Sequence, residues 1–378
     1  MSVQKVRSRK PAVAAALLAL TALSACGSSS SDTASTTPSG AASGAPSGAA
    51  SGAPSGVKNA KIAFLMPDLA STRYEQFDAP LFKAKMKELC PTCEVLYQNA
   101  AADAAKQQEQ ANSVIAQGVK AIVIDAVDSA AAATIVKTAQ SRKIPIISYD
   151  RPIPAAPADY YVSFDNEKIG ASIAQSLVDD MKKKNIQGGL LQINGSPTDA
   201  AAGLIKKGVH SVVDSSGLKL LAEYDTPEWA PAKAQDWTAG QITQFSGKIG
   251  GVVAANDGTG GGAISAFKAA GVNPLPPVTG NDAELAAIQR IVNGDQYNTI
   301  SKPIKIVAEG AAEIAIAFAK GEKLAGKTTL FDTPSQLFTP TVVTQDNIKK
   351  EMFDSGLLKA SDVCTGAYAD GCAKLGIK

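Results

Sequence analysis

The chain has 378 residues, and its 37 basic residues nearly balance its 35 acidic ones, which gives a formal net charge of +2. The body from Val57 onward carries no basic tract, so nucleic acid is excluded as the expected partner. This body is long enough for two domains.

The first 25 residues have the layout of a secretory signal. A basic lead over residues 5–10 precedes the apolar run "AVAAALLALTAL", which is too short to favour a membrane-spanning helix. The run ends in "LSAC", residues 23–26, which is typical of a bacterial lipobox. We therefore expect residues 1–25 to be removed and Cys26 to carry a lipid. An ordinary signal peptide followed by an incidental cysteine is the alternative.

The segment after Cys26 is rich in small residues. Residues 27–56 hold no large apolar side chain and repeat a Ser-Gly-Ala-Pro theme. Such a segment cannot bury enough surface to offset its ordering entropy, so residues 26–57 are predicted to form a disordered tether. The expected product is an extracytoplasmic body, lipid-anchored to the outer face of the cell membrane.

From residue 60 onward, short apolar strands alternate with segments of helical spacing. Helices of ten or more residues between strands indicate parallel sheets covered on both faces. About ten strands are too many for one compact sheet, so two doubly wound α/β domains are predicted. The predicted strands are 61–66, 94–98, 120–125, 144–149, 160–164, 188–193, 219–224, 249–255, 276–280 and 296–301. The predicted helices are 74–89, 103–118, 131–141, 167–183, 200–214, 261–271, 283–294 and 304–321.

Polar and aromatic residues gather after the predicted strands. Ligands of doubly wound sheets bind beyond the carboxyl ends of the strands, so these residues are the candidate site. The candidates are Arg73, Tyr74, Asp150, Arg151, Asp165, Asn166, Asp199, Trp229, Asn256, Asp282 and Lys302.

This residue set suits a sugar. Adjacent hydroxyls both donate and accept, which matches a carboxylate beside a guanidinium, as in Asp150 and Arg151. The C–H faces of a sugar ring suit an aromatic plate such as Tyr74 or Trp229. We expect Asp150 and Arg151 to balance one another's charge while both bind the ligand. The alternative for this dipeptide is a solvated surface pair that contributes ~0–1 kcal/mol.

Four cysteines remain after Cys26. In an oxidising compartment, Cys90 with Cys93 and Cys364 with Cys372 are expected to form two short-range disulfides. A thioredoxin-like redox pair or a set of metal ligands is the alternative. The single histidine, His210, lies in a helical pattern, and we expect no metal and no cofactor.

Several segments together resemble one family. They are "YDR" (149–151), "FDNEKIG" (164–170), "GSPTD" (195–199), "NDGTGGGAI" (256–264), "GNDAELAAIQRI" (280–291), "SKPI" (301–304) and "LFTPTVVTQDNIK" (337–349). In this order the chain resembles the periplasmic sugar-binding proteins of ABC transporters, of type 1 fold, in the xylose and multiple-sugar-binding branch. The resemblance covers about residues 60 to 355.

The resemblance implies two Rossmann-like lobes joined by a hinge of three crossings, near Phe164–Asp165, near Ser301–Lys302 and near residue 330. It places the family's sugar contacts on Arg73, Asp150, Arg151, Asn256, Asp282 and Lys302, and its stacking aromatics on Tyr74 and Trp229. The expected parts are an N-terminal lobe (58–164 plus 303–330), a C-terminal lobe (165–302 plus 331–345) and a C-terminal tail (346–378) with a disulfide.

One departure from the family concerns the sugar. The xylose-like branch continues "GSP" with Asp-Asn-Asn-Ala, where an asparagine reaches the ligand, whereas this chain reads Asp199-Ala200-Ala201-Ala202. Because a site that bonds a hydroxyl discriminates by it, the identity of the sugar stays open. Inositol, an autoinducer or a nucleoside are alternatives to a xylose-like pentose or related aldose.

The resemblance implies a monomeric binding lipoprotein that delivers a monosaccharide to an ABC permease and its ATPase. A sensory use of the same clamp, with a chemoreceptor or sensor kinase as partner, stays open. An extracytoplasmic sugar hydrolase using Asp150, Asp165 or Asp282 is a further alternative, but no G-x-S-x-G elbow or metal-ligand cluster accompanies them. The glycines of 256–263 fit neither the G-x-x-x-x-G-K-[ST] nor the G-x-G-x-x-G spacing of phosphate-binding loops. With no active-site constellation visible, the protein is not expected to be an enzyme.

Overall fold

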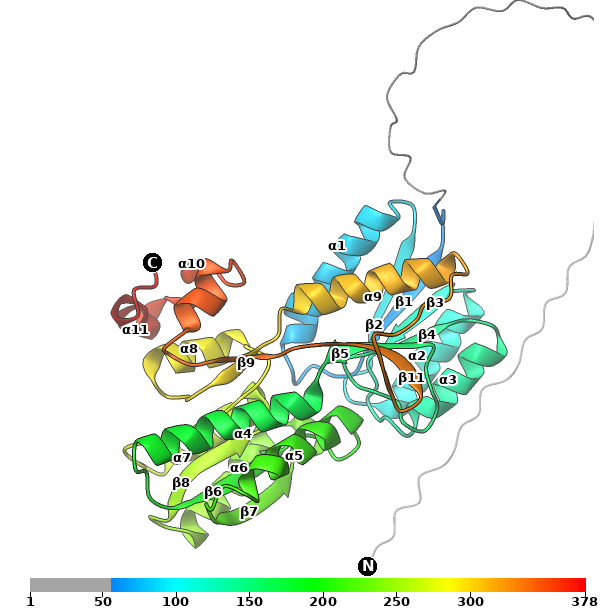
Figure 1. The fold of residues 1–378 in the computed structure, drawn as a ribbon. Helices are drawn as coiled ribbons and strands as arrows, with labels where there is room; N and C mark the ends of the chain where they lie inside the picture. Colours follow the sequence, from blue (N-terminus) through cyan, green and yellow to red (C-terminus); the bar gives the residue numbers. More distant parts are fainter. Residues whose placement is uncertain (1–55) are drawn as a thin grey trace, which may run out of the picture. The chain divides into compact units, whose positions relative to one another are not determined.

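The computed structural model describes residues 56–378. These residues lie in one compact unit that begins at Ala53, and the predicted signal peptide and most of the tether lie outside the described residues. Two separate parallel sheets form the unit, each with helices on both faces (Figure 1). The prediction of two doubly wound α/β lobes is therefore confirmed.

The N-terminal lobe is built on a seven-stranded sheet of order β10-β11-β5-β4-β3-β1-β2. Its pairs are parallel except for β10 with β11. The strands are β1 (Lys61–Met66), β2 (Glu94–Asn99), β3 (Ala121–Ile124), β4 (Ile146–Tyr149), β5 (Tyr160–Phe164), β10 (Thr328–Leu330) and β11 (Thr333–Phe338).

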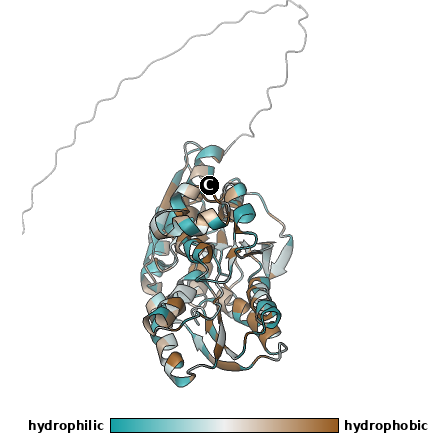
Figure 2. Ribbon diagram, turned by 90° about the vertical axis from the view of Figure 1, so that its left-hand side faces the viewer, coloured by the Kyte–Doolittle hydropathy of each residue, from teal (hydrophilic) through white to brown (hydrophobic). Residues whose placement is uncertain are grey.

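Side chains of β1 alternate between the two apolar cores of this lobe, as a strand buried on both faces requires. Phe64 belongs to the core beneath α1 (Ala79–Leu89) and α9 (Ile304–Ala319). Leu65 belongs to the core beneath α2 (Ala104–Ala116) and α3 (Ala132–Ser141). In Figure 2 the helices carry brown and teal segments side by side, as helices with one apolar face should.

The C-terminal lobe has a three-stranded parallel sheet of order β7-β6-β8, which the bridge between Val252 and Val278 extends. Helices α4 and α5 cover one face, and α6 and α7 cover the other. The elements are α4 (Asn166–Lys183), β6 (Gly189–Asn194), α5 (Ala200–Val213), β7 (Leu220–Asp225), the short helix η2 (Pro227–Trp229), α6 (Pro231–Gln244), β8 (Ile249–Ala254), α7 (Asp257–Ala269) and α8 (Leu285–Asn293).

Three connections join the lobes. The chain passes from β5 into α4, from β9 (Thr299–Ser301) into α9, and from β11 into β12 (Thr341–Val343). Strands β9 and β12 pair with each other in antiparallel fashion, so two of the three connections are bonded side by side.

One predicted boundary is wrong. We expected residues 331–345 in the C-terminal lobe, but β11 pairs with β5 in the sheet of the N-terminal lobe, from Ser335 opposite Tyr161 to Phe338 opposite Phe164. The third crossing therefore lies after Phe338 instead of near residue 330. The hairpin of β10 and β11 completes the edge of the sheet, which a single-sequence pattern does not reveal.

The C-terminal segment is not a loose tail. It forms a π-helix (Lys349–Asp354), α10 (Ala360–Val363), a short 3₁₀ helix (Gly366–Tyr368) and α11 (Ala369–Lys374). Figure 1 shows α10 and α11 beside α8, and buried Val363 and Cys372 share an apolar core with residues of α8.

The structure joins Cys90 to Cys93 and Cys364 to Cys372, the pairs expected from the sequence. Among the described helices, none combines the length and the apolar character needed to span a membrane.

Candidate functional site

A small cavity lies where the carboxyl ends of the strands of the two lobes meet. Its walls come from loops after β1, β4, β6 and β8, from the starts of α4 and α5, and from the crossing after β9. The lining residues are Ser71, Tyr74, Asp150, Arg151, Asn166, Asp199, Ala201, Ile205, Trp229, Asn256, Asn281, Asp282 and Lys302. Nine of the eleven predicted site residues are among them, and Arg73 and Asp165 are not.

Arg73 lies directly behind the cavity wall, where it links the two lobes. Its guanidinium is 2.8 Å from Asp150 Oδ2, 3.5 Å from Asp78 Oδ1 and 3.4 Å from Asp282 Oδ1. Lys302 Nζ also pairs with Asp282 Oδ1, at 2.7 Å. Arg73 is 2% exposed, so it positions two carboxylates that face the cavity.

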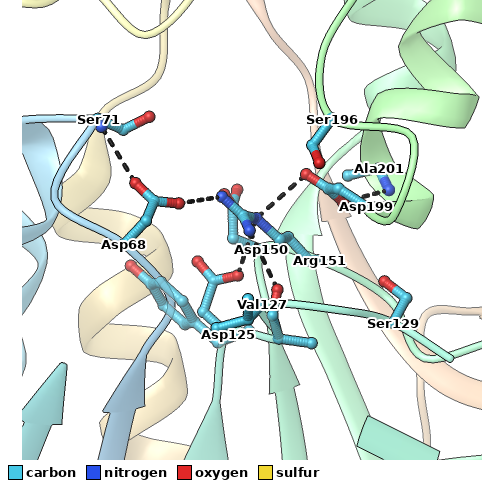
Figure 3. A network of polar contacts seen from close by, with 12 residues as sticks. Asp68, Ser71, Asp125, Val127, Ser129, Asp150, Arg151, Ser196, Asp199 and Ala201 are labelled. Atoms are coloured by element: carbon cyan, nitrogen blue, oxygen red, sulfur yellow. Dashed lines mark hydrogen bonds and ion pairs between the residues drawn. The ribbon is translucent and has the colours of Figure 1, made fainter. Parts of the chain in front are cut away.

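Arg151 is the centre of a second network, shown in Figure 3. Its Nη2 donates to Asp68 Oδ2 at 2.7 Å and to the Tyr74 hydroxyl at 3.1 Å. Its Nε lies 3.3 Å from Asp125 Oδ1 and 3.1 Å from Asp199 Oδ2. Because Asp199 starts α5 in the C-terminal lobe, this arginine also connects the lobes.

Asp150 and Arg151 form their direct ion pairs with different partners, although the charge of Arg151 still acts on Asp150. Asp150 pairs with Arg73, while Arg151 pairs with Asp68, Asp125 and Asp199. Asp150 has a positive φ of 58°, a conformation that few non-glycine residues adopt, and its carbonyl accepts from the Tyr161 and Ser163 hydroxyls at 2.8 and 2.9 Å. The positive φ at Asp150 turns the side chains of Asp150 and Arg151 toward different partners.

Asp199 and Trp229 form one rigid unit on the C-terminal side of the cavity. Asp199 caps α5 by accepting from the Ala201 N–H at 2.7 Å, and it accepts from Trp229 Nε1 at 3.0 Å. The indole lies directly on Gly195, where an added Cβ would be 2.1 Å from the ring. Only glycine leaves room for this approach.

Asn256 and Asn281 present polar groups toward the cavity. Asn256 Oδ1 caps α7 by accepting from the Thr259 N–H at 2.9 Å, so its amide nitrogen can face the cavity. Asn281 is 2% exposed, and its Oδ1 is buried without a hydrogen-bond partner among the described residues. A buried acceptor without a partner is costly unless a ligand supplies a donor.

Asp165 is not part of the cavity, whereas Asn166 and Tyr74 line it as predicted. Asp165 lies outside the cavity and caps α4, accepting from the Lys168 N–H at 3.0 Å. Asn166 lines the cavity and donates from Nδ2 to the Tyr161 hydroxyl at 3.2 Å. The Tyr74 ring has the Arg73 guanidinium 5.0 Å and the Arg151 guanidinium 5.9 Å from its centroid. Two cations therefore lie near the ring, and its stacking on a sugar stays a prediction.

Sequence reasoning missed three buried acids, Asp68, Asp78 and Asp125. Asp68 and Asp125 follow β1 and β3, so the rule that selected Asp150 could have found them. Asp78 lies in the π-helix Tyr74–Asp78, where it accepts from the Tyr149 hydroxyl at 2.5 Å. No strand end marks it, and helical spacing alone gives it no signal.

Carboxylates outnumber cations around the cavity, and burial separates their pKa values. Burial disfavours the charged form of Asp150, but Arg73, Lys302 and Arg151 prevail and lower the pKa of its carboxyl. Burial raises the pKa of Asp78 to about 6 against the effect of Arg73. It also raises the pKa of Asp125 and of Asp199 against the effect of Arg151. Asp150 therefore stays ionised beside its cations, whereas burial favours the neutral form of the other three carboxyls.

A second acidic group supports the loop that carries Asp282. Asp257 is fully buried and accepts from the Glu284 N–H and the Thr299 hydroxyl, both at 2.9 Å. Burial and the charge of Glu284 raise the pKa of Asp257 to about 8. Burial and the charge of Asp282 raise the pKa of Glu284 to about 7, and its Oε1 accepts from the Thr72 N–H of the other lobe at 3.0 Å.

Among the described residues, no cluster of His, Cys, Asp and Glu has metal-binding geometry.

Two lobes with this topology and a cavity between them define a periplasmic binding protein of type 1 fold. Residues 62–323 match the family of the periplasmic binding protein domain, and the chain belongs to this family.

Individual relatives agree with this assignment. The D-xylose-binding periplasmic protein of Escherichia coli is 36% identical over 314 residues, which are 81% of this chain and 93% of that protein. The multiple sugar-binding periplasmic receptor ChvE of Rhizobium radiobacter is 29% identical over 69% of this chain and 81% of its own length. A solute-binding protein from Clostridium phytofermentans, solved with bound β-D-glucose, has a TM-score of 0.72 and 26% identity, covering 80% of this chain and 99% of its own.

Proposed function

We propose that this protein captures a neutral monosaccharide outside the cytoplasm and delivers it to an ABC importer. The observation that carries the proposal is a cavity lined by both lobes, whose polar walls include the carboxylates of Asp150 and Asp282 and the amide of Asn256. Asn281 also lines it, and its Oδ1 is buried without a hydrogen-bond partner among the described residues. Carboxylate and amide oxygens accept from sugar hydroxyls, while the amide of Asn256 and the ammonium of Lys302 donate to them.

The charge around the cavity supports a neutral ligand. Arg73, Arg151 and Lys302 are each paired with carboxylates, and Asp78 and Asp125 add further acidic groups. A phosphorylated or acidic sugar would bring a negative charge into a buried region whose cations are already paired with carboxylates. The names of the relatives, which are sugar-binding proteins, support the same class.

The arrangement of the three predicted acids supports binding rather than catalysis. A sugar hydrolase needs a protonated carboxyl as general acid next to a second carboxylate. The pKa of Asp150 is lowered, so it stays ionised, and Arg73 bridges it to Asp282. Asp165, the third predicted acid, lies outside the cavity. Asp150 and Asp282 are therefore proposed as hydroxyl acceptors.

The proposal includes the anchor and the partners. Cys26 lies outside the described residues, and a lipid on it would keep the body at the outer face of the membrane beside a permease and its ATPase. Recognition of the closed form by a chemoreceptor or sensor kinase belongs to the same proposal, because either partner would read the same closed lobes.

A thermal-shift screen tests the proposal. The purified protein is heated with xylose, ribose, arabinose, glucose, galactose, fucose or inositol at millimolar concentration. A ligand that binds only the folded state adds ~2.7 kcal/mol of stability at a hundredfold excess over Kd, so one or two sugars should raise the Tm.

Site variants complete this test. Asp150→Asn and Asp282→Asn each remove a charged acceptor and should weaken sugar binding at least tenfold, about 1.4 kcal/mol. Asp346→Asn, an exposed position away from the cavity, is the matched control and should bind as the wild type does. Absence of a shift with every sugar, or undiminished binding by both site variants, would contradict the proposed function.

A further inference from the structure

The cavity has one wall that differs chemically from the others. Ala201 and Ile205 lie one turn apart on α5 and both line the cavity, at 5% and 2% exposure. Trp229 continues this wall. We name Ala201, Ile205 and Trp229 the α5 wall.

The side chains of the α5 wall offer a ligand no free hydrogen-bonding group, because Ala201 and Ile205 are apolar and the indole N–H of Trp229 is bonded. Trp229 Nε1 donates to Asp199 Oδ2 at 3.0 Å, and the Ala201 N–H donates to Asp199 Oδ1 at 2.7 Å. Asp199 Oδ2 also lies 3.1 Å from Arg151 Nε. The polar atoms nearest to the wall are therefore already bonded to one another.

The rest of the cavity lining is largely polar. It includes Asp150, Asn256, Asn281, Asp282 and Lys302, and Asn281 Oδ1 is buried without a partner among the described residues. A bound sugar can bond its hydroxyls on these sides. On the α5 side, a hydroxyl would lose water and find no partner in exchange, whereas a carbon that carries only hydrogen would gain apolar contact.

We infer that the bound sugar turns an unhydroxylated carbon toward the α5 wall, so that the site prefers a 6-deoxyhexose to its parent hexose. The inference rests on the proposed function and specifies its substrate class. Ala201 and Ile205 are then specificity-determining residues, because their side chains decide which substituent of the sugar is accepted on this side.

Calorimetric titration of the purified protein with matched sugars tests the inference. One set is D-galactose, D-fucose and L-arabinose, and the other is D-glucose, 6-deoxy-D-glucose and D-xylose. Within a set the ring hydroxyls have the same configuration, and the substituent on C5 is hydroxymethyl, methyl or hydrogen. In the set that binds, the methyl sugar should bind at least about tenfold tighter than the hydroxymethyl sugar, since the latter buries a hydroxyl without a partner.

Two variants separate polarity from size. Ala201→Asn places an amide in the wall and should reduce the preference for the methyl sugar about tenfold, because the hydroxyl then has a partner. Ile205→Thr, which adds a hydroxyl to the same wall, should also reduce the preference for the methyl sugar. It replaces Ala201→Asn in the test if that variant does not fold. Ala200→Asn, the same change one residue away and outside the cavity lining, is the matched control and should keep the wild-type preference.

The outcomes are distinguishable. A hydroxymethyl sugar that binds as tightly as its methyl counterpart overturns the inference and leaves the proposed function standing. Binding of only the pentose of a set also overturns the inference and leaves the proposed function standing, since size would then exclude both larger sugars. A preference unchanged in folded wall variants also overturns it. If none of the six sugars binds, the proposed function fails and the inference with it.

Discussion

At the scale of single residues, Asp150 and Arg151 show how buried charges decide local structure. The two are adjacent in the chain, yet each has its own partners of opposite charge. A buried ion needs more than one charge or hydrogen-bond partner to offset its desolvation, and a single neighbour does not supply this. The positive φ of Asp150 lets both side chains reach such partners.

The first prediction at this scale concerns Asp257. Its folded pKa of about 8 is raised above the ordinary value of 3.8, so the folded state holds a proton that the unfolded chain releases. The stability linked to this proton is fully present below the unfolded pKa and is lost as the pH rises through the folded pKa. Between about pH 5 and about pH 8, this group should lower the free energy of unfolding by up to ~1.4 kcal/mol per pH unit.

Denaturant unfolding across this pH range checks the expectation. Asp257→Asn carries no titratable group and should flatten the slope, whereas Asp370→Asn, at an exposed position, should keep the wild-type slope. Equal slopes for Asp257→Asn and the wild type would show that the residue is ionised in the folded state. Glu284, with a pKa raised to about 7, contributes in the same direction and remains in both variants.

The candidate site could be predicted in large part from one rule, that polar residues after parallel strands face a ligand. The rule found the cavity residues Asp150, Asn256 and Asp282, but it also selected Asp165, whose carboxylate caps a helix instead. Helix capping and ligand binding use the same residue types at the same place in the chain, so sequence alone does not separate them.

At the scale of secondary-structure elements, the packing of α4 against α5 depends on glycine. Gly170 of α4 lies against the Ile205 carbonyl, and Gly208 of α5 lies against the Glu167 carbonyl, where an added Cβ would be 1.9 and 2.0 Å from these oxygens. The backbones therefore approach too closely for any side chain. This contact holds the first turn of α5, with its cavity residues, in place.

Gly208→Ala should destabilise the protein by about 1–3 kcal/mol, because the two helices have to move apart. Gly203, in the same helix, has open space around its Cβ position and serves as the matched control. Gly203→Ala should be neutral or stabilise by up to about 1 kcal/mol through helix propensity. Thermal or denaturant unfolding measures both changes, and a Gly208→Ala protein as stable as the wild type would refute the packing argument.

Elements with a regular apolar pattern were predictable, and those fixed by tertiary contacts were not. The strands β1 to β8 each lie within a predicted strand, apart from small shifts at their ends, because continuous apolar runs mark buried strands. The strand β11 and the helices after residue 346 have no such pattern. Their places depend on the edge of a sheet and on the apolar side of α8, which lie far away in the sequence.

At the scale of the whole body, direct contacts between the lobes accompany the ligand cavity. Arg151 with Asp199 forms one contact, and the Thr72 N–H with Glu284 Oε1 forms another. A third joins residue 129 to the start of α5, where the Ser129 N–H donates to the Thr198 carbonyl at 2.9 Å and the Ser129 hydroxyl accepts from the Ala200 N–H at 3.0 Å. Because these contacts join the two lobes directly, we expect them to bias the equilibrium between open and closed lobes.

Ser129 allows this bias to be tested without touching the ligand, because it does not line the cavity. Ser129→Ala removes the acceptor of the Ala200 N–H and should destabilise the closed form by about 1 kcal/mol. Sugar affinity should then fall about fivefold, mostly through faster dissociation, while the ranking of sugars stays the same since the cavity is unaltered. Stopped-flow dissociation with competing sugar measures the rate, and Ser265→Ala, on the exposed face of α7, is the control. An unchanged dissociation rate would mean that the ligand alone sets closure, and a changed ranking of sugars would mean that Ser129 shapes the site itself.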